Sequence, residues 1–291
     1  MDLSNGLVAV DWGTSNRRVF VLDPQGNILR SSEDDHGILN CSDFPAEVAG
    51  IRADSGGLPI LMAGMVGSNR GWVEVPYVAA PATLATLAAG VKWVEPGVGI
   101  VPGVSYLEGT AADVMRGEEV QLVGALALGA IGDGLVAHPG THGKWVEIVD
   151  SSILRFRSVM TGDIFAALKA KSILSDLLAH PAGTGEAFIA GVDHALENPD
   201  LTAELFSTRA RVLLGAAPAE DASSYISGLL IGSEVRTGLG RVRADNVPLI
   251  GETVLTERFA IALARAGRTT TIVDGDTAFI AGIRAIAGAA A

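Results

Sequence analysis

Residues 7–30 read LVAVDWGTSNRRVFVLDPQGNILR, and residues 134–157 read GLVAHPGTHGKWVEIVDSSILRFR. Each stretch alternates apolar runs with turn residues, which predicts three consecutive strands joined by two tight turns. An offset of 127 residues places Gly13 on Gly140 and Asp23 on Asp150, in the first and second turn of each stretch. The shared layout indicates an internal duplication, with one copy at the start of each half of the chain.

The rest of the chain alternates apolar strands with helical segments, a pattern typical of the α/β class. Helices are expected at 81–90, 118–130, 163–178, 185–196, 201–214, 218–239 and 253–266, the last of them capped by Thr253. The two meanders predict two lobes, residues 1–131 and 132–291, with a cleft between them. A last helix over 275–287 is expected to pack near the hinge.

Composition excludes several classes of protein. The chain has 291 residues and a formal net charge of −12, which argues against a general nucleic-acid-binding protein. Its single cysteine, Cys41, excludes an internal disulfide, an all-cysteine zinc site and an iron–sulfur cluster. The N-terminal residues do not resemble a secretory signal, and no apolar run is long enough to span a bilayer. We expect a cytoplasmic protein without a nucleic-acid or membrane partner.

The first Gly-Thr turn, DWGTS at 11–15, is a candidate phosphate-binding loop. Gly13 lets the backbone turn tightly, and successive N–H groups in such a turn form an anion-binding concavity. Thr14 and Ser15 add hydroxyl donors, and Asp11 at the strand end is suited to hold Mg2+ through water. The alternative is a plain hairpin turn, because the pattern D-x-G-T occurs often by chance.

The second turn, HPGTHGK at 138–144, repeats the Gly-Thr pair without the acid. Gly140 and Thr141 offer the same contacts, and Lys144 adds a positive charge. If the two halves face each other across a cleft, the two turns grip the two ends of a triphosphate. The alternative for His138 and His142 is that of ordinary turn residues, since no partner stands at zinc-ligand spacing.

A cluster of acids, DVMRGEE at 113–119, precedes an expected helix. Phosphoryl transfer to a hydroxyl needs a carboxylate that takes the proton of that hydroxyl. Asp113, Glu118 and Glu119 are candidates for this base. The alternative is that Glu118 and Glu119 are first-turn acids favoured by the helix dipole, with Arg116 in a surface ion pair.

Residues 64–74, GMVGSNRGWVE, form a glycine-rich segment after an apolar strand. Asn69 suits sugar hydroxyls, and Arg70 can bind a carboxylate through two hydrogen bonds. The alternative is a glycine-rich surface loop.

Residues 250–253, IGET, join an expected strand to a helix. Gly251 would let a flat ring lie on the backbone, and the helix start offers N–H groups. A plain strand-to-helix junction explains these residues almost as well.

These segments together resemble the sugar kinase–actin–heat-shock ATPase superfamily. Its two phosphate motifs resemble residues 11–15 and 138–144, its adenosine motif resembles 247–253, and its closing helix resembles DGDTAFIAGIRAI at 274–286. More narrowly, four strings closely resemble the 2-dehydro-3-deoxygalactonate kinases. They are AGMVGSNRGWVEVPYVAAP at 63–81, DVMRGEE at 113–119, PGTHGKWV at 139–146 and MTGDIFAAL at 160–168.

The resemblance implies two ribonuclease H-like lobes with ATP in the cleft. It implies transfer of the ATP γ-phosphoryl to the 6-hydroxyl of 2-dehydro-3-deoxy-D-galactonate in bacterial galactonate catabolism. Asp11 would orient Mg2+. Nucleotide contacts would come from Gly13, Thr14, Ser15, Gly140, Thr141, Lys144, Gly251 and Glu252.

The same resemblance assigns the acid sugar to Asn69, Arg70, Trp72 and Arg116, with Arg70 at its carboxylate. Relatives place a catalytic Asp just before a helix. Residue type favours Asp113 as that base, and position next to the helix favours Glu118; we favour Asp113 and keep Glu118 as the alternative.

Two other functions remain as alternatives. One is a kinase of the same fold for another sugar acid, such as 2-dehydro-3-deoxygluconate. The other is a non-metabolic ATP-driven binding module, whose iron–sulfur versions need several cysteines where this chain has one. The expected partners are a small sugar acid and ATP, and a homodimer is compatible with the sequence.

Overall fold

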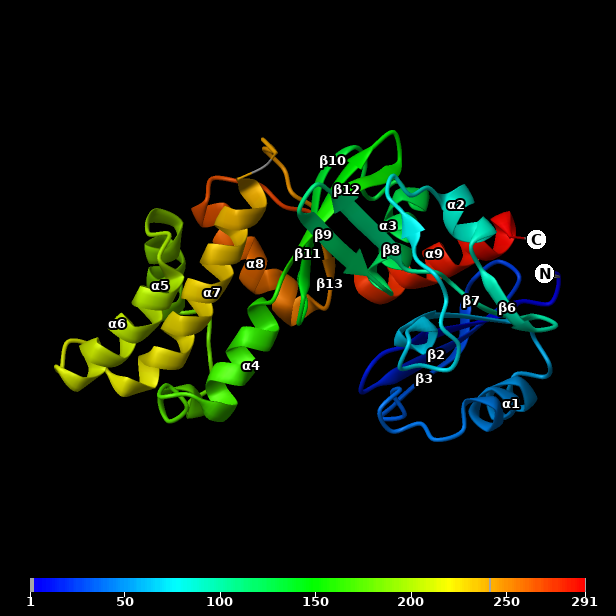
Figure 1. The fold of residues 1–291 in the computed structure, drawn as a ribbon, viewed down its shortest axis with the longest axis horizontal. Helices are drawn as coiled ribbons and strands as arrows, with labels where there is room; N and C mark the ends of the chain where they lie inside the picture. The colour runs from blue at the N-terminus through cyan, green and yellow to red at the C-terminus, as the bar shows by residue number, and fades with distance from the viewer. Residues whose placement is uncertain (1–2, 241, 291) are drawn as a thin grey trace. The chain divides into compact units, whose positions relative to one another are not determined.

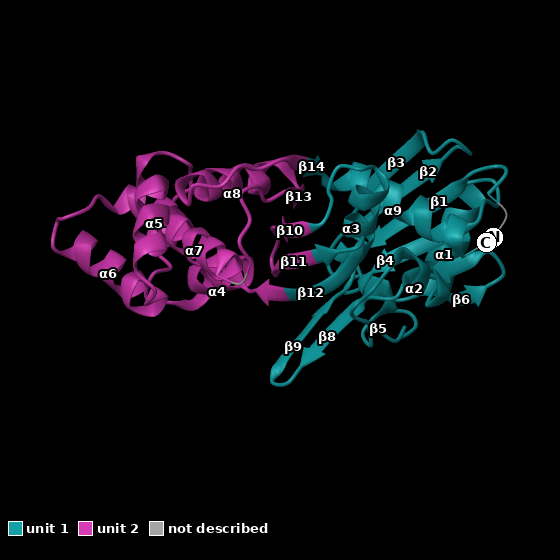
Figure 2. Ribbon diagram, turned by 90° about the horizontal axis from the view of Figure 1, so that it is seen from above, with its two compact units in different colours: residues 1–133, 148–156, 273–291 teal, residues 134–147, 157–272 magenta. Residues whose placement is uncertain are grey.

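A computed structural model describes residues 3–240 and 242–290 and divides the chain into two compact units (Figure 2). Unit 1 comprises residues 1–133, 148–156 and 273–291, and unit 2 comprises residues 134–147 and 157–272. In the described part of the chain, no helix combines the length and the apolar character that crossing a membrane requires.

Unit 1 is built on a sheet with strand order β3-β2-β1-β4-β7-β6. Its strands are β1 (Leu7–Trp12), β2 (Arg17–Leu22), β3 (Ile28–Asp34), β4 (Ile60–Gly64), β6 (Lys92–Glu95) and β7 (Val98–Ile100). β1 pairs antiparallel with β2 and parallel with β4. Every residue of β1 except Asp11 is buried, as expected for a central strand covered on both faces.

The helices of unit 1 are α1 (Phe44–Asp54), α2 (Leu84–Ala89), α3 (Glu118–Ala127) and α9 (Gly275–Ala289), with a 3₁₀ turn at Met65–Gly67. A small second sheet joins β5 (Val78–Ala79), β8 (Val104–Glu108) and β9 (Ala111–Met115). α3 and α9 pack together so closely that a Cβ on Gly124 would overlap the carbonyl oxygen of Ala278. A Cβ on Gly282 would likewise overlap the carbonyl oxygen of Val120.

A five-stranded sheet has the order β12-β11-β10-β13-β14. Its strands are β10 (Gly134–His138), β11 (Gly143–Val149), β12 (Ser152–Val159), β13 (Leu249–Gly251) and β14 (Ile272–Asp274). The meander β10-β11-β12 has the same layout as β1-β2-β3. In each meander the first strand also pairs in parallel with a later strand: β1 pairs with β4, and β10 pairs with β13. This repeated order confirms the layout predicted from the 127-residue offset.

The helices of unit 2 are α4 (Thr161–Lys171), α5 (Glu186–Glu197), α6 (Leu201–Leu213), α7 (Ala222–Leu239) and α8 (Thr253–Arg265), with 3₁₀ turns at Leu177–Ala179 and Ala219–Asp221. α5 and α6 both pack against α7 (Figures 1 and 2). The expected capping by Thr253 is wrong, because Glu252 is the N-cap and Thr253 is the first helical residue. The Thr253 carbonyl instead accepts a bond from Thr256.

Candidate active site

The first Gly-Thr loop connects β1 to β2 in unit 1. The N–H of Gly13 donates to the carbonyl of Asn16 at 2.9 Å, which closes the turn. Thr14 and Ser15 are exposed, and no hydrogen bond among the described residues uses their backbone N–H groups. The loop therefore offers adjacent N–H and hydroxyl donors to an anion.

Asp11 stands at the end of β1, directly opposite Arg18 on β2. The Arg18 guanidinium bonds the Asp11 carboxylate and also bonds Asp276 in the first turn of α9. Burial raises the pKa of Asp11, although the Arg18 charge acts in the opposite direction; the negative charges of Asp276 and Glu118 add to the rise. One cation is thus shared by two carboxylates beside the first loop.

The two candidate bases lie in different settings. Glu118 is the first residue of α3, and its Oε2 accepts from the N–H of Arg116 at 3.0 Å. Its charge acts on Asp11. Asp113, by contrast, lies inside β9, where its Oδ1 accepts from the N–H of Val114 at 2.8 Å. The structure therefore brings Glu118, and not the strand residue, next to the first loop.

Two glycines allow three parts of unit 1 to approach one another closely: the start of α3, the end of β1 and the end of β4. Gly117, the N-cap of α3, has φ +113°, and Gly64 at the end of β4 has φ +92°, so both favour glycine. A Cβ on Gly117 would lie 3.5 Å from the Gly64 Cα, and a Cβ on Gly64 would lie 3.3 Å from Asp11 Oδ1. This packing brings the Glu118 helix start and the loop after β4 to the same place as Asp11.

Glu119, the third acid of the 113–119 cluster, is fully buried. Both of its carboxylate oxygens accept from the N–H of Gly117, at 2.9 and 2.7 Å. Burial, reinforced by the neighbouring Glu118 charge, raises the pKa of Glu119 to about 8. The side chain therefore anchors the backbone at the start of α3.

The loop after β4 carries the predicted sugar-acid residues. Asn69 and Arg70 are exposed, and Trp72 is half-buried. Arg116 reaches this loop: its Nη2 donates to the carbonyl of Val75 at 2.7 Å, and its guanidinium lies 4.3 Å from the ring centroid of Tyr77. Its Nε and Nη1 are buried and have no hydrogen-bond partner among the described residues. These two N–H groups are suited to a carboxylate.

The second Gly-Thr loop connects β10 to β11 in unit 2. Thr141 is exposed, and its carbonyl accepts from the N–H of Asp163 at the start of α4 at 3.2 Å. Lys144 is only 4% exposed, and its Nζ donates to the carbonyl of His142 at 2.7 Å. The buried Lys144 thus stabilises the loop through this hydrogen bond, while Thr141 is exposed on the surface of the loop.

Glu234 on α7 is a second buried acid, and it lies behind this loop. Its Oε1 accepts from Trp145 Nε1 at 3.1 Å, and a Cβ on Gly143 would overlap that oxygen. Burial raises the pKa of Glu234 to about 7, although Thr161, Trp145 and Lys144 act to lower it. Gly143 is therefore required at the turn by the close approach of this carboxyl group.

A cavity of about 290 Å³ adjoins the second loop within unit 2. Its walls come from the loop, α4, α7 and α8, and include Gly140, Thr141, Phe165, Leu255, Arg258 and Phe259. Gly251 and Glu252 are not among the lining residues, but Gly251 adjoins the second loop: a Cβ there would lie 3.5 Å from the Pro139 carbonyl oxygen. Sequence reasoning missed the α4 and α8 residues of this cavity.

Sequence reasoning also missed Arg18 and Asp276. A signal for Arg18 was present, because a tight turn over 13–16 pairs residue 11 with residue 18 in an antiparallel hairpin. Asp276 carried no comparable signal, since α9 lies at the other end of the chain.

Comparison with known proteins shows near full-length relatives. A family model described as 2-keto-3-deoxy-galactonokinase matches residues 11–286. The chain is 38% identical over 290 residues to the 2-dehydro-3-deoxygalactonokinase of Escherichia coli strain K12, with 98% of each sequence covered. A crystal structure from Sinorhizobium meliloti, provisionally assigned as a 2-dehydro-3-deoxygalactonokinase, has a TM-score of 0.90 at 36% identity and covers 97% of this chain and 98% of that one.

A more distant structure shows the breadth of the fold. Component A of (R)-2-hydroxyglutaryl-CoA dehydratase from Acidaminococcus fermentans has a TM-score of 0.54 at 12% identity, covering 98% of this chain and 99% of that one. The predicted fold, the two-lobed α/β architecture of sugar kinases and actin-like ATPases, is confirmed. The chain belongs to the 2-keto-3-deoxy-galactonokinase family, a family of sugar-acid kinases.

Proposed function

We propose that this protein transfers the γ-phosphoryl group of ATP to the 6-hydroxyl of 2-dehydro-3-deoxy-D-galactonate in D-galactonate catabolism. The hydroxyl oxygen forms the new bond to phosphorus, its proton passes to a carboxylate, and ADP leaves. The observation that carries the proposal is the grouping of Glu118 with the Asp11–Arg18 pair, beside a loop with donors for an anion. Membership of the family supports the acid-sugar substrate.

Glu118 is the proposed general base. It begins α3 at the point where the backbone of Gly117 meets Gly64 and Asp11. A base must lie within hydrogen-bond reach of the proton that it removes, so it belongs beside the loops that hold the two substrates. Asp113 lies within a strand and bonds its own neighbour, which makes it the weaker candidate.

Asp11 and Asp276 are the proposed carboxylates for Mg2+. They already contact one cation, the Arg18 guanidinium, and Mg2+ in phosphate sites takes one or two carboxylates together with phosphate oxygens and water. The oxygen donors present therefore fit this ion. When bound, Mg2+ supplies positive charge to the phosphates. Arg18 supplies a second, fixed positive charge from the protein.

The proposed nucleotide contacts use both Gly-Thr loops. Thr14 and Ser15 offer hydroxyls and backbone N–H groups to phosphate oxygens, next to Gly13. In the second loop, Gly140 and Thr141 are the proposed phosphate contacts. The mostly apolar cavity beside that loop is the proposed site for the adenine ring, because nucleotide bases favour such pockets.

The remaining nucleotide residues take less direct roles. Gly251 and Glu252 at the start of α8 are proposed to adjoin the nucleoside part. Lys144 is proposed to position the second loop through its bond to His142, with its charge acting on the phosphates at longer range.

Arg116 is the proposed partner of the substrate carboxylate. Two of its N–H-bearing nitrogens are buried and lack partners among the described residues, and a buried unpaired donor is costly unless a ligand satisfies it. Asn69 and Trp72 on the adjoining loop are proposed to contact the sugar hydroxyls and carbon chain. Arg70 is exposed and is proposed to contact the sugar acid at the solvent-facing edge of its binding site.

A coupled ADP-release assay with Mg-ATP tests this function. The panel comprises 2-dehydro-3-deoxygalactonate, its C4 epimer 2-dehydro-3-deoxygluconate, related aldonic acids and neutral sugars. We expect strong preference for the galactonate derivative and none for neutral sugars. Preference for the gluconate epimer would replace the proposed substrate within the same fold, and ATP turnover independent of every sugar acid would contradict a sugar-acid kinase.

A further inference from the structure

A second segment of unit 1, residues 35–40, binds the first Gly-Thr loop through backbone hydrogen bonds. Three consecutive N–H groups, those of residues 37–39, donate to three consecutive carbonyls of the loop. Gly37 donates to Ser15 at 3.1 Å, Ile38 to Gly13 at 3.0 Å and Leu39 to Thr14 at 3.2 Å. A Cβ on Gly37 would overlap the backbone of Ser15, so the two segments are in direct backbone contact. The carbonyl oxygens of the loop are therefore fixed by this segment.

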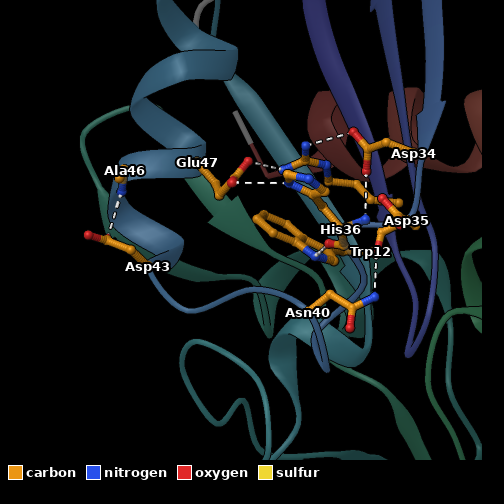
Figure 3. Close-up of polar contacts among 9 residues, drawn as sticks. Trp12, Asp34, Asp35, His36, Asn40, Asp43, Ala46 and Glu47 are labelled. Carbon is orange, nitrogen blue, oxygen red and sulfur yellow. Dashed lines mark hydrogen bonds and ion pairs between the residues drawn. The ribbon is translucent and has the colours of Figure 1, made fainter.

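Segment 35–40 is in turn fixed by side chains from β1, β3 and α1 (Figure 3). The indole N–H of Trp12 donates to the carbonyl of His36 at 2.8 Å, and the N–H of His36 donates to Asp34 at 3.0 Å. The ring Nδ1 of His36 lies 3.1 Å from Glu47 Oε1. His36, the residue just before the three donors, is thus tied to three different elements.

Arg17 joins these side chains into one cluster. It is 6% exposed, and its guanidinium bonds Asp34 and Glu47, each at 2.7 Å. The same guanidinium lies 5.0 Å from the ring centroid of Trp12. The hydrogen bond from Arg17 holds the pKa of Glu47 below its ordinary value, so the pair remains charged at neutral pH. Hydrogen bonds to charged groups are stronger than neutral ones, which makes this cluster stiff.

We propose that Arg17, Trp12 and Glu47 are positioning residues for ATP. They fix His36, the following N–H groups fix the carbonyls of the Gly-Thr loop, and the loop therefore presents its own N–H groups in one arrangement. Holding donors in a productive arrangement before binding reduces the entropy lost on binding. This inference rests on the proposed function, because it assigns the first loop to ATP.

Trp12→Phe and Glu47→Gln test the cluster. Trp12→Phe removes the N–H that bonds His36 but keeps a ring under Arg17, and Glu47→Gln removes the charge but keeps the side-chain length. The matched controls are Trp93→Phe, at a partly exposed tryptophan on β6, and Asp193→Asn, which breaks an ion pair with Arg265 in unit 2. Thermal unfolding of each variant verifies that the fold is retained.

Two readouts distinguish positioning from general stability. Hydrogen–deuterium exchange without nucleotide compares the exchange rates of the 37–39 amides with those of the β1 amides. Calorimetric titration with a non-hydrolysable ATP analogue reports affinity. In both cluster variants we expect faster exchange at 37–39 with β1 unchanged. Affinity for the analogue should fall by about tenfold, the equivalent of one lost hydrogen bond, and the sugar-acid KM should be unchanged. The controls should match the original protein.

Unchanged exchange at 37–39 would overturn the positioning role, and so would faster exchange with unchanged affinity for the analogue. Failure of the unsubstituted protein to bind the analogue would overturn the proposed function and the assignment of this loop to ATP. The two failures are distinguishable, because exchange is measured before any nucleotide is added.

Discussion

Arg18 lies directly opposite Asp11 on the antiparallel pair of β1 and β2, and its guanidinium also bonds Asp276 on α9. The first and last parts of the chain therefore meet at one cation beside the first Gly-Thr loop. Two carboxylates keep this guanidinium in place before any phosphate arrives. A fixed positive charge at the proposed site of phosphoryl transfer needs no reorganisation during the reaction.

Arg18→Gln should lower kcat by about 10²-fold, the usual cost of removing one preorganised charge partner of the transition state. The sugar-acid KM should change little, because Arg18 bonds the Asp11 cluster and not the loop after β4. The measurement is steady-state ADP release with both substrates varied. Arg284→Gln is the matched control, because Arg284 on α9 lies away from the Asp11 cluster and bonds the turn carbonyl of Pro24. Equal kcat in the original protein and the Arg18 variant would show that Arg18 does not take part in the reaction.

Glu118→Gln should lower kcat by roughly 10²- to 10⁴-fold, the range for loss of a general base, with ATP affinity nearly unchanged. Asp113→Asn should retain near-normal turnover, because this residue lies within β9 and bonds its own neighbour. Both variants are measured by ADP release at saturating substrates. The reverse result would restore Asp113 as the base, and normal turnover in both would exclude each of them.

Arg116→Ala should raise the sugar-acid KM by about 100-fold, as for a lost hydrogen bond between charged groups. Arg70→Ala should raise it less, because Arg70 is exposed, whereas Arg116 has buried N–H groups that find no partner in the part of the chain that the structure describes. The ATP KM reports whether the site is otherwise intact and should be unchanged in both variants. A larger effect at Arg70 than at Arg116 would assign the carboxylate to Arg70 instead.

The sequence predicted the fold where local patterns and the fold agreed. The apolar runs of β1 and β10, each followed by a Gly-Thr turn, predicted both meanders and their duplication. The acid cluster at 113–119 does precede a helix, α3, but the sequence did not predict the β8–β9 hairpin in which Asp113 lies. That short hairpin pairs with β5 and has only a few buried positions. Its alternation of apolar and polar residues was therefore too weak to predict two strands.

The candidate site was predictable only where its residues are close in sequence. Asp11 at the end of β1 lies only a few residues before Thr14 and Ser15 in the turn, and Glu118 follows Gly117 directly. Asp276 reaches the first loop only because α9 packs back on unit 1, and residues of α4, α7 and α8 meet at the cavity only through tertiary packing. The burial that raises the pKa of Glu119 is likewise a property of the folded unit and not of its neighbours in sequence.

The two buried acids predict how stability depends on pH. The folded-state pKa is raised from 4.5 to about 8 for Glu119 and to about 7 for Glu234. Above pH 4.5 the unfolded chain releases these protons while the folded protein keeps them, so each acid lowers stability as pH rises towards its folded pKa. The slope is at most about 1.4 kcal/mol per pH unit for each group.

Glu119→Gln and Glu234→Gln should therefore gain stability relative to the original protein between pH 5 and pH 7. Glutamine keeps the shape and one acceptor oxygen but does not titrate. The measurement is the thermal unfolding midpoint of each variant at both pH values, with exposed Glu257→Gln as the control. A midpoint difference that is the same at pH 5 and pH 7 would show that the two acids are already ionised in the folded state.

Gly124→Ala should destabilise unit 1 by about 2 kcal/mol, because overpacking a tight contact costs more than the gain in helix propensity. The added methyl would overlap the Ala278 carbonyl and push α3 away from α9. Since Glu118 begins α3 and Asp276 lies in the first turn of α9, kcat should fall together with the unfolding midpoint. Gly288→Ala is the control within α9, where a Cβ meets open space and alanine should be neutral or stabilising. If Gly124→Ala matched that control in both midpoint and kcat, the close contact of α3 with α9 would not be what aligns these acids.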